Sequence, residues 1–236
     1  YITDEKTYLH ETDLICVIGG DGTFLRTARM FIKQNKPIFG INKGRLGFLT
    51  EFYPKESLKH LKNVFNGNFQ IAKRMTLETT QKKNKNNITS YCVNDAVISK
   101  GAFSRAIEVE IEIENKLLHT FSGDGLIIST PTGSTAYSLS AGGPIINPNI
   151  SEVFEVTPVC PHSLSIRPMI ISAESELKVR IITKIPNKML TIDGQDAIEI
   201  QDDEELIIKK SPYDINLITH PEKSYYQILR EKLGWG

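Results

Sequence analysis

An acidic residue inside a glycine-rich turn is the first feature of this sequence that suggests chemistry. Residues 19–23 read Gly-Gly-Asp-Gly-Thr, and an apolar run at 14–18 precedes them. Glycines allow close approach of the backbone to a ligand, and a helix start after the turn would offer N–H groups and a positive dipole end to a phosphate. Because a carboxylate repels phosphate, Asp21 suggests a base or a group that acts through a metal. The alternative is that Asp21 or Thr23 only caps the helix.

Residues 123–144 form a second stretch of interest because glycine and hydroxyl side chains are concentrated there. A strand expected at 126–129 enters the sequence Thr-Pro-Thr-Gly-Ser-Thr-Ala-Tyr at 130–137. Small residues leave space for a ligand, hydroxyl groups hydrogen-bond a ribose or an amide, and Tyr137 could stack on a flat ring. A Ser/Thr-rich turn that caps a short helix is the alternative. A long loop that only connects two elements is costly in chain entropy, so we favour a ligand site.

Other polar residues carry weaker signals. Asn94 and Asp95 stand where a strand is expected to begin, and by themselves they could form a turn. His162 lies between a proline and a serine in a segment that looks structural, and a lone histidine is more often satisfied in a loop than catalytic. No His or Cys pattern has the spacing of zinc ligands. Glutamates alternate with Ile and Val at 107–114, and this row is most simply the solvated face of a strand.

The elements that must position the Gly-Gly-Asp-Gly-Thr turn alternate between strand and helix. The apolar run at 14–18 predicts a buried strand, and a second strand is expected at 37–42. Between them, apolar residues at helical spacing predict a helix, namely Phe24, Leu25, Ala28, Phe31 and Ile32. A glycine-punctuated loop at 43–49 and a helix at 57–65 follow. Strand–helix–strand order with short connections predicts a parallel sheet, with loops gathered at the carboxyl ends of its strands.

The sequence changes character near residue 70, where strand patterns replace helical ones. Period-two alternation predicts a strand at 107–114, and further strands are expected at 91–98, 125–130, 176–182, 188–192 and 206–209. Asp193-Gly194 between two such runs is a hairpin signal, and residues 225–233 have a helical pattern. We therefore predict an α/β domain at 1–68, a β-rich domain at 69–212, and a C-terminal segment at 213–236 that returns to the first domain.

Composition limits the classes of function. The chain has 236 residues, a formal net charge of zero and three cysteines. Zero net charge gives no overall field that favours nucleic acid or an anionic membrane, and no run reaches the roughly 20 apolar residues of a membrane helix. An odd and scattered set of cysteines favours a reducing compartment over a disulfide framework, so we expect a cytoplasmic protein. Because the chain starts at Tyr1 rather than Met, the lack of a visible leader is weak evidence.

In order and spacing, the motifs together resemble those of the NAD kinases, and the likeness covers nearly the whole chain. They are Gly-Gly-Asp-Gly-Thr at 19–23, Asn94-Asp95, the block at 123–144, Pro-His-Ser-Leu-Ser-Ile-Arg-Pro at 161–168, and Asp193-Gly194-Gln195. The first motif alone also resembles that of diacylglycerol and sphingosine kinases and, more loosely, of phosphofructokinases. The Thr-Pro-Thr-Gly-Ser-Thr-Ala-Tyr block is far more specific to NAD kinases, and the run at 42–49 resembles their bacterial branch.

This resemblance implies a reaction and a fold. The γ-phosphoryl of ATP, or polyphosphate in some members, would pass to the 2′-hydroxyl of the adenosine ribose of NAD to give NADP. The implied fold is a Rossmann-like N-terminal α/β domain and a β-rich C-terminal domain, with the substrate between them. Family members usually have another strand and helix before the glycine turn, so we expect part of the N-terminal sheet to be absent here. Magnesium or another divalent metal would arrive with ATP, and a homodimer or homotetramer is expected, with neither nucleic acid nor membrane as a partner.

The resemblance also assigns roles to residues. Asp21 matches the general base, and Asp124 matches an acid near the nicotinamide amide. Asn94 and Asp95 match the pair that holds the hydroxyls of the adenosine ribose. The other nucleotide-binding positions that it implies are Gly20, Gly22, Thr23, Arg26, Arg105, Thr135, Ala136, Tyr137, Ser138, Leu139, Ser140, Val159 and Gln195. Of these, the two glycines and the threonine that flank Asp21 would contact phosphates through backbone N–H groups, and Arg26 would add a cation unless it is only a surface arginine.

Two other functions stay open as alternatives. A lipid kinase of the diacylglycerol or sphingosine type shares the glycine turn, but the hydroxyl-rich loop is a poor lining for acyl chains. A non-catalytic dinucleotide-binding module, such as a sensor, could use the same loops without ATP chemistry.

Overall fold

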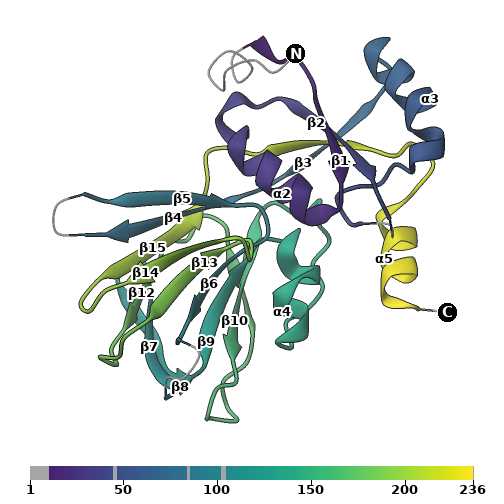
Figure 1. Ribbon diagram of the computed structural model, residues 1–236. Helices are drawn as coiled ribbons and strands as arrows, with labels where there is room; N and C mark the ends of the chain where they lie inside the picture. Colours follow the sequence, from purple (N-terminus) through teal and green to yellow (C-terminus); the bar gives the residue numbers. More distant parts are fainter. Residues whose placement is uncertain (1–10, 45–46, 84–85, 102–104, 236) are drawn as a thin grey trace. The chain divides into compact units, whose positions relative to one another are not determined.

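The computed structural model describes residues 11–44, 47–83, 86–101 and 105–235 (Figure 1). These residues form two compact units. One contains the chain up to Arg74 and from Tyr213 onward, and the other is Met75–Pro212. The first boundary lies after Arg74 rather than after residue 68, because strand β3 (Gln70–Arg74) pairs with β16 (Ile215–Thr219) of the first unit. Among the helices that these residues form, none is long and apolar enough to cross a membrane.

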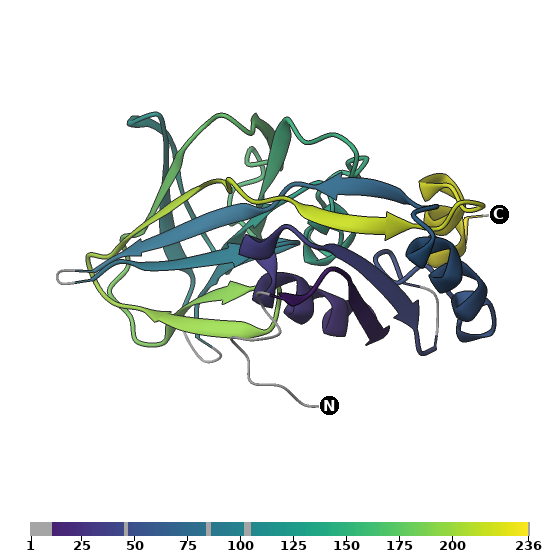
Figure 2. The same ribbon diagram turned by 90° about the horizontal axis from the view of Figure 1, so that it is seen from above.

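The first unit is built on a four-stranded sheet with the order β1-β2-β16-β3. β1 (Ile15–Gly19) and β2 (Pro37–Asn42) are parallel, as the sequence predicts, and β16 lies parallel to β2. β3 is antiparallel to β16, and Figure 2 shows the blue β3 beside the yellow-green β16. The sequence predicts that β1 is buried on both faces, but the side chains on one of its faces are exposed. Among the described strands β1 lies at the edge of the sheet, only its alternate residues are buried, and Ile18 is 66% exposed.

Three α-helices lie wholly within the described residues of this unit. They are α2 (Asp21–Met30), α3 (Pro54–Phe65) and α5 (Tyr225–Leu233), and the 3₁₀ turn η1 (Ile32–Gln34) follows α2. The buried face of α2 is the apolar face that the sequence predicts. α3 begins at Pro54, earlier than predicted, because proline suits the first helical position and Glu56 accepts the N–H of Tyr53 at 3.0 Å.

The second unit consists of two antiparallel six-stranded sheets. The first sheet, in the order β11-β10-β9-β6-β13-β14, contains β6 (Asp95–Ser99), β9 (Gly125–Ser129), β10 (Val153–Val159), β11 (Met169–Ser172), β13 (Lys188–Ile192) and β14 (Asp196–Ile200). The second, in the order β5-β4-β15-β12-β7-β8, contains β4 (Leu77–Lys82), β5 (Ile88–Cys92), β7 (Ile107–Ile113), β8 (Lys116–Gly123), β12 (Leu177–Ile181) and β15 (Glu205–Lys210). The 3₁₀ turn η2 (Gly133–Thr135) and the short helix α4 (Tyr137–Ser140) follow β9.

Side chains from both sheets form one buried cluster, which explains the alternating patterns of the strands. Ile98 and Leu126 from the first sheet join Val109 and Leu206 from the second in this cluster. The outer face of the second sheet carries the glutamate row, as predicted. Arg180 of β12 lies across that face and forms ion pairs with the side chains of Glu110, Glu112 and Glu205.

The run at 91–98 is predicted as one strand, but the chain changes sheets inside it. β5 ends at Cys92 in one sheet and β6 begins at Asp95 in the other. The N–H groups of Val93 and Asn94 between them donate to the carboxylate of Asp193, at 3.1 and 2.7 Å, and not to a neighbouring strand. The predicted hairpin is confirmed, because Asp193 lies at the turn between β13 and β14.

Candidate functional site

The second unit contains a pocket of about 620 Å³ on one face of the sheet that contains β6. Val97 lines the pocket, whereas its neighbours Ala96 and Ile98 belong to the core. Because successive side chains of a strand point to opposite faces, the pocket lies on the face away from the core. Six of the predicted nucleotide-binding residues line it: Asn94, Asp95, Asp124, Ala136, Tyr137 and Val159. They come from the start of β6, from the position just before β9, from the end of β10, and from the start of α4, and these three strands are neighbours in the sheet.

Asp193 fixes the part of the pocket formed by Asn94 and Asp95. Its carboxylate accepts hydrogen bonds from three consecutive N–H groups, those of Val93, Asn94 and Asp95, at 3.1, 2.7 and 3.1 Å. Its own N–H donates to the carbonyl of Asp95 at 2.9 Å. Both residues of the hairpin turn have positive φ, 49° at Asp193 and 65° at Gly194, which Asp and Gly tolerate better than most residues. The hairpin signal in the sequence therefore marks a residue that shapes the pocket, a role that the sequence reasoning missed.

Asn94 carries a side-chain acceptor that no group among the described residues uses. Its side-chain Oδ1 is buried and, within the described part of the chain, has no hydrogen-bond partner. Its carbonyl accepts the N–H of Thr130 at 2.8 Å, which holds the start of the hydroxyl-rich loop against it. A Cβ at Gly133 would lie 2.1 Å from the same carbonyl oxygen, so only glycine permits this approach. An unpaired buried acceptor on a residue that lines a pocket is suited to a ligand hydroxyl or N–H group, because unpaired buried polar atoms are costly.

Asp95 is the group whose ionisation is most perturbed in the pocket. It is 4% exposed, and burial together with the nearby charge of Asp193 raises its pKa from 3.8 to about 7. Both causes act in the same direction, because each disfavours a carboxylate. Near neutral pH the side chain therefore exchanges between an acid that donates a hydrogen bond and a carboxylate that accepts two or more.

An ion pair and an exposed aromatic ring border the pocket. Lys100 Nζ lies 2.7 Å from Oδ1 of Asp124, and both side chains are partly exposed. The sequence reasoning missed Lys100, because a lysine after a strand carries no signal without its partner. Tyr137 is 48% exposed and lines the same pocket, so its ring is accessible to a flat group of a ligand.

Several other predicted residues do not line the pocket: Arg105, Thr135, Ser138, Leu139, Ser140 and Gln195. Ser138 points into the interior, where its Oγ lies 2.6 Å from Oε1 of Glu155 and 2.8 Å from Oγ1 of Thr157. Burial raises the pKa of Glu155, which favours its protonated form in this cluster. The hydroxyl of Ser138 is therefore not available to a ligand in the pocket, and it anchors α4 instead.

Asp21 lies in the first unit, at the first residue of α2. Neither Asp21 nor Thr23 caps the helix, because Gly20 is the N-cap and no side chain bonds there. Instead, Oδ1 of Asp21 accepts the N–H groups of Leu49 and Thr50 and the hydroxyl of Thr50, at 3.0, 3.1 and 3.1 Å. Oδ2 accepts one hydrogen bond among the described residues, from the N–H of Phe48 at 2.8 Å. The carboxylate is thus fixed in orientation while Oδ2 keeps a lone pair for a proton or a ligand.

The backbone around Asp21 differs from the expectation at one position. The N–H of Thr23 donates to the carbonyl of Gly20 at 3.1 Å, so it is not free for a phosphate. Gly22, Thr23 and Arg26 are all exposed, which leaves the side chains of Thr23 and Arg26 accessible. Across from Asp21, a Cβ at Gly47 would lie 2.0 Å from Oδ1, so the loop before Phe48 approaches the carboxylate only because residue 47 is glycine.

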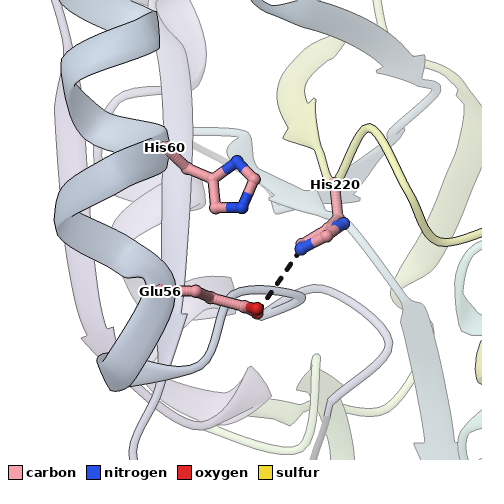
Figure 3. A group of neighbouring side chains, drawn as sticks. All are labelled: Glu56, His60 and His220. Carbon is pink, nitrogen blue, oxygen red and sulfur yellow. Dashed lines mark ion pairs between the residues drawn. The ribbon is translucent and has the colours of Figure 1, made fainter.

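A second polar cluster in the first unit joins Glu56 and His60 of α3 to His220, which follows β16 (Figure 3). Sequence spacing could not reveal it, because His220 is far from α3 in the chain. Nδ1 of His220 accepts the N–H of Glu222 at 3.1 Å, so the neutral ring carries its proton on Nε2, 3.4 Å from Oε1 of Glu56. Burial, and then the charge of Lys223, lower the pKa of His220 and favour that neutral ring.

These contacts argue against a metal at this cluster, although its ligand atoms lie within 4.8 Å of one another. Lys223 Nζ is 3.2 Å from the Glu56 oxygen that a metal would need. Metal binding through Nε2 of His220 would also require its proton to move to Nδ1 and break the bond from Glu222. We assign the cluster to packing between α3 and the end of β16, where the two imidazole rings lie 4.7 Å apart.

Comparison with known proteins adds independent findings. Family models for the ATP-NAD kinase N-terminal domain and the ATP-NAD kinase C-terminal domain match residues 5–69 and 93–220. An NAD kinase of Natranaerobius thermophilus is 43% identical over 95% of this chain and 78% of its own length. An NAD kinase of Magnetococcus marinus is 42% identical over 94% of this chain and 74% of its own length.

Solved structures agree with these relatives. The crystal structure of yeast NADH kinase complexed with NADH has a TM-score of 0.93 and 32% identity, and covers 100% of this chain and 70% of that one. An NAD kinase from Archaeoglobus fulgidus in complex with ATP has a TM-score of 0.80 and 26% identity, and covers 97% of this chain and 86% of that one. The likeness includes the hydroxyl-rich loop as well as the glycine turn, and neither the lipid-kinase alternative nor the non-catalytic alternative is supported. The expected fold class, a Rossmann-like α/β domain with a β-rich C-terminal domain, is confirmed, and the chain belongs to the NAD kinase family.

Proposed function

We propose that this protein transfers the γ-phosphoryl group of ATP, or of polyphosphate, to the 2′-hydroxyl of the adenosine ribose of NAD, giving NADP. The observation that carries the proposal is the pocket of the second unit, which is lined both by Asn94, whose side-chain Oδ1 has no partner among the described residues, and by the buried Asp95. Adjacent acceptors of this kind suit the two neighbouring hydroxyls of a ribose. The family membership supports the reaction, and relatives bound to NADH and to ATP support the two classes of ligand.

The remaining pocket residues supply shape and orientation for the dinucleotide. Tyr137 offers an aromatic face to a flat ring, and Ala136 leaves space beside it. Val159 lines the adenine end, and Asp124 lies near the carboxamide of the nicotinamide, where its ion pair with Lys100 sets its position. Thr135, Leu139, Ser140, Arg105 and Gln195 are further proposed contacts, for ligand groups that extend beyond the pocket.

Asp21 acts as the general base in this proposal. Its Oδ2 has room to accept the proton of the ribose hydroxyl as the new P–O bond forms, while the three contacts at Oδ1 hold the carboxylate in one orientation. An alcohol is far less acidic than a carboxylic acid, so the proton moves late in the step. Positioning and charge stabilisation then supply most of the rate enhancement.

The phosphate groups of the donor are held at the start of α2 in this proposal. Gly20 and Gly22 keep the backbone accessible, and the hydroxyl of Thr23 and the guanidinium of Arg26 supply polar contacts. Magnesium enters as part of the MgATP substrate, bound mainly by phosphate oxygens.

We also propose a homodimer or homotetramer in the cytoplasm. The edge strand β11 exposes Met169 and Ile170, at 43% and 52%, and an apolar edge of this kind favours association between copies of the chain. The cysteines that the structure describes form no disulfide bond with one another, which suits a reducing compartment. Light scattering behind a sizing column tests the first statement, because a monomer at all concentrations contradicts it.

A coupled assay tests the reaction. The purified protein is mixed with NAD and MgATP, and an NADP-specific dehydrogenase reports the product. We expect NADP to form, and none above background would contradict the proposal. Asn94→Ala should weaken NAD binding by about tenfold or more, because it removes a buried hydrogen bond to the ligand. Asn86→Ala, at an exposed loop position, is the matched control and should leave binding unchanged.

A further inference from the structure

Two buried aspartates meet at one backbone segment in the second unit, because Asp95 belongs to this segment and Asp193 accepts hydrogen bonds from its N–H groups. Asp95 is 4% exposed and Asp193 is 7% exposed. They differ in how their charge is stabilised. Asp193 receives three N–H groups, from Val93, Asn94 and Asp95, and hydrogen bonds of this kind favour an ionised carboxylate. The neighbouring Asp95 therefore faces a fixed negative charge.

The same three hydrogen bonds determine the backbone shape at the ribose-binding pair. Residues 93–94 belong to neither β5 nor β6, so strand pairing does not set their conformation. The hydrogen bonds to Asp193 take the place of strand pairing here, because consecutive N–H groups can converge on one carboxylate only in a restricted set of turns. The side chains of Asn94 and Asp95 consequently depend on Asp193 for their direction into the pocket.

Among the described residues that line the pocket, no further charge offsets this arrangement. Among the described residues that line it, the remaining charged groups are Lys100 and Asp124, which pair with each other at 2.7 Å. Burial and the charge of Asp193 are also the causes that raise the pKa of Asp95 to about 7. Hydroxyl donors from a ribose favour the ionised form of Asp95, as hydrogen bonds to a carboxylate do in general.

We propose that Asp193 is a positioning residue that fixes the Asn94-Asp95 turn and keeps a proton on Asp95 in the empty pocket, so that binding of the dinucleotide releases this proton. The O–H bond of Asp95 breaks, its electron pair stays on the carboxylate, and the proton passes to the buffer. The ligand identity rests on the proposed function, whereas the coupling of the two carboxyl groups does not.

The coupling is tested first without ligand. The carboxyl carbon of Asp95 is followed by NMR as a function of pH in the wild type and in Asp193→Asn. Asn is tolerated at the positive φ of 49° and keeps the side-chain shape, so the charge is removed and one acceptor oxygen becomes an NH2 donor. We expect the midpoint to fall clearly below about pH 7 in the variant, and an unchanged midpoint overturns the inference. Asp203→Asn is the matched control, because Asp203 also has a positive φ, 64°, and its side chain is 85% exposed.

Calorimetry of NAD binding tests the release. Titrations in buffers of different ionisation enthalpy measure the number of protons released. This number should approach one per NAD near pH 6 and fall to zero near pH 8, because these values lie about one pH unit below and above the midpoint of the Asp95 titration. Asp193→Asn should weaken NAD binding about tenfold or more at the higher pH and release fewer protons at the lower pH, and wild-type values for both overturn the inference. Asp193→Glu keeps the charge with altered geometry, so it should restore proton release without restoring affinity.

A variant that leaves Asp193 intact guards against misfolding. Asp95→Asn cannot ionise, so proton release on NAD binding should vanish, and its persistence overturns the inference. If the wild type fails to bind NAD, the proposed function fails, and the ligand-free titration of Asp95 still decides whether Asp193 controls its charge.

Discussion

Gly47→Ala perturbs the placement of Asp21 without touching either reacting molecule. A Cβ at residue 47 would lie 2.0 Å from Oδ1 of Asp21 and 2.5 Å from Oγ1 of Thr50. Because an ordinary contact begins near 3.4 Å, the carboxylate and the loop must separate by about 1.4 Å. That shift is larger than the tolerance of a hydrogen bond, so at least one of the N–H contacts from Leu49 and Thr50 is lost.

The expected effects on catalysis and stability follow from this shift. Misplacing a catalytic group by about 1 Å costs on the order of 100-fold in rate, so kcat should fall by about that factor. The KM for NAD should change little, because the dinucleotide pocket belongs to the other unit. Loss of a charge-assisted hydrogen bond should lower the unfolding free energy by about 1–3 kcal/mol. Steady-state kinetics by the coupled NADP assay and urea denaturation measure the two effects.

Gly44→Ala is the control for this experiment. It lies in the same loop, and a Cβ there would meet nothing within 4 Å, so its kinetics and stability should match the wild type. If Gly47→Ala retains wild-type kcat, the carboxylate of Asp21 does not need its observed position, and the reasoning about its orientation is refuted. A loss of kcat equal in both variants would instead indicate a general effect of alanine in the loop.

Further predictions concern ionisation, packing and metals. Because the folded pKa of Asp95, about 7, lies above its ordinary value of 3.8, its contribution to stability is complete below pH 4 and is lost as the pH rises to 7. The unfolding free energy of the wild type relative to Asp95→Asn should therefore fall by about 4 kcal/mol over that range, measured by denaturant titration at each pH. Ser138→Ala should lower the unfolding free energy by about 1–3 kcal/mol because Glu155 loses a buried donor, whereas exposed Ser140→Ala should cost less than about 0.5 kcal/mol in the same denaturation assay. Zinc should leave the melting temperature of the wild type unchanged, as it should that of His220→Gln. A zinc-dependent rise in melting temperature that is confined to the wild type would contradict the packing role of His220.

Local patterns were sufficient to predict the elements whose residues carry their own start and stop signals. The predicted bounds of α5 match the structure, because Ser224 caps its N-terminus by accepting the N–H of Gln227 and Gly234 ends it at a φ of 66°. β2 and β13 likewise match their predicted ranges. These signals act within a few residues, so a single sequence contains them.

Long-range pairing could not be predicted in the same way. β16 reads as a short apolar run, and its place between β2 and β3 depends on partners that lie far away in the chain. The direction of Ser138 toward Glu155 depends on how α4 packs on β10. The convergence of three N–H groups on Asp193 depends on a contact across about one hundred residues. The motifs in the sequence were therefore sufficient to propose the candidate site. The residues that hold those motifs in place could be identified only in the structure.

Single-turnover conversion of NAD to NADP by Asp21→Asn tests the central claim most directly. Asn cannot accept the ribose proton, although it can still accept some of the hydrogen bonds from the loop at 48–50. We predict that the variant binds NAD with wild-type affinity by calorimetry, while its single-turnover rate with MgATP falls by about 100-fold or more. Asp13→Asn, an exposed aspartate of the same unit, should react at the wild-type rate. A wild-type rate in Asp21→Asn would contradict the account, because the proton would then leave the hydroxyl without this carboxylate.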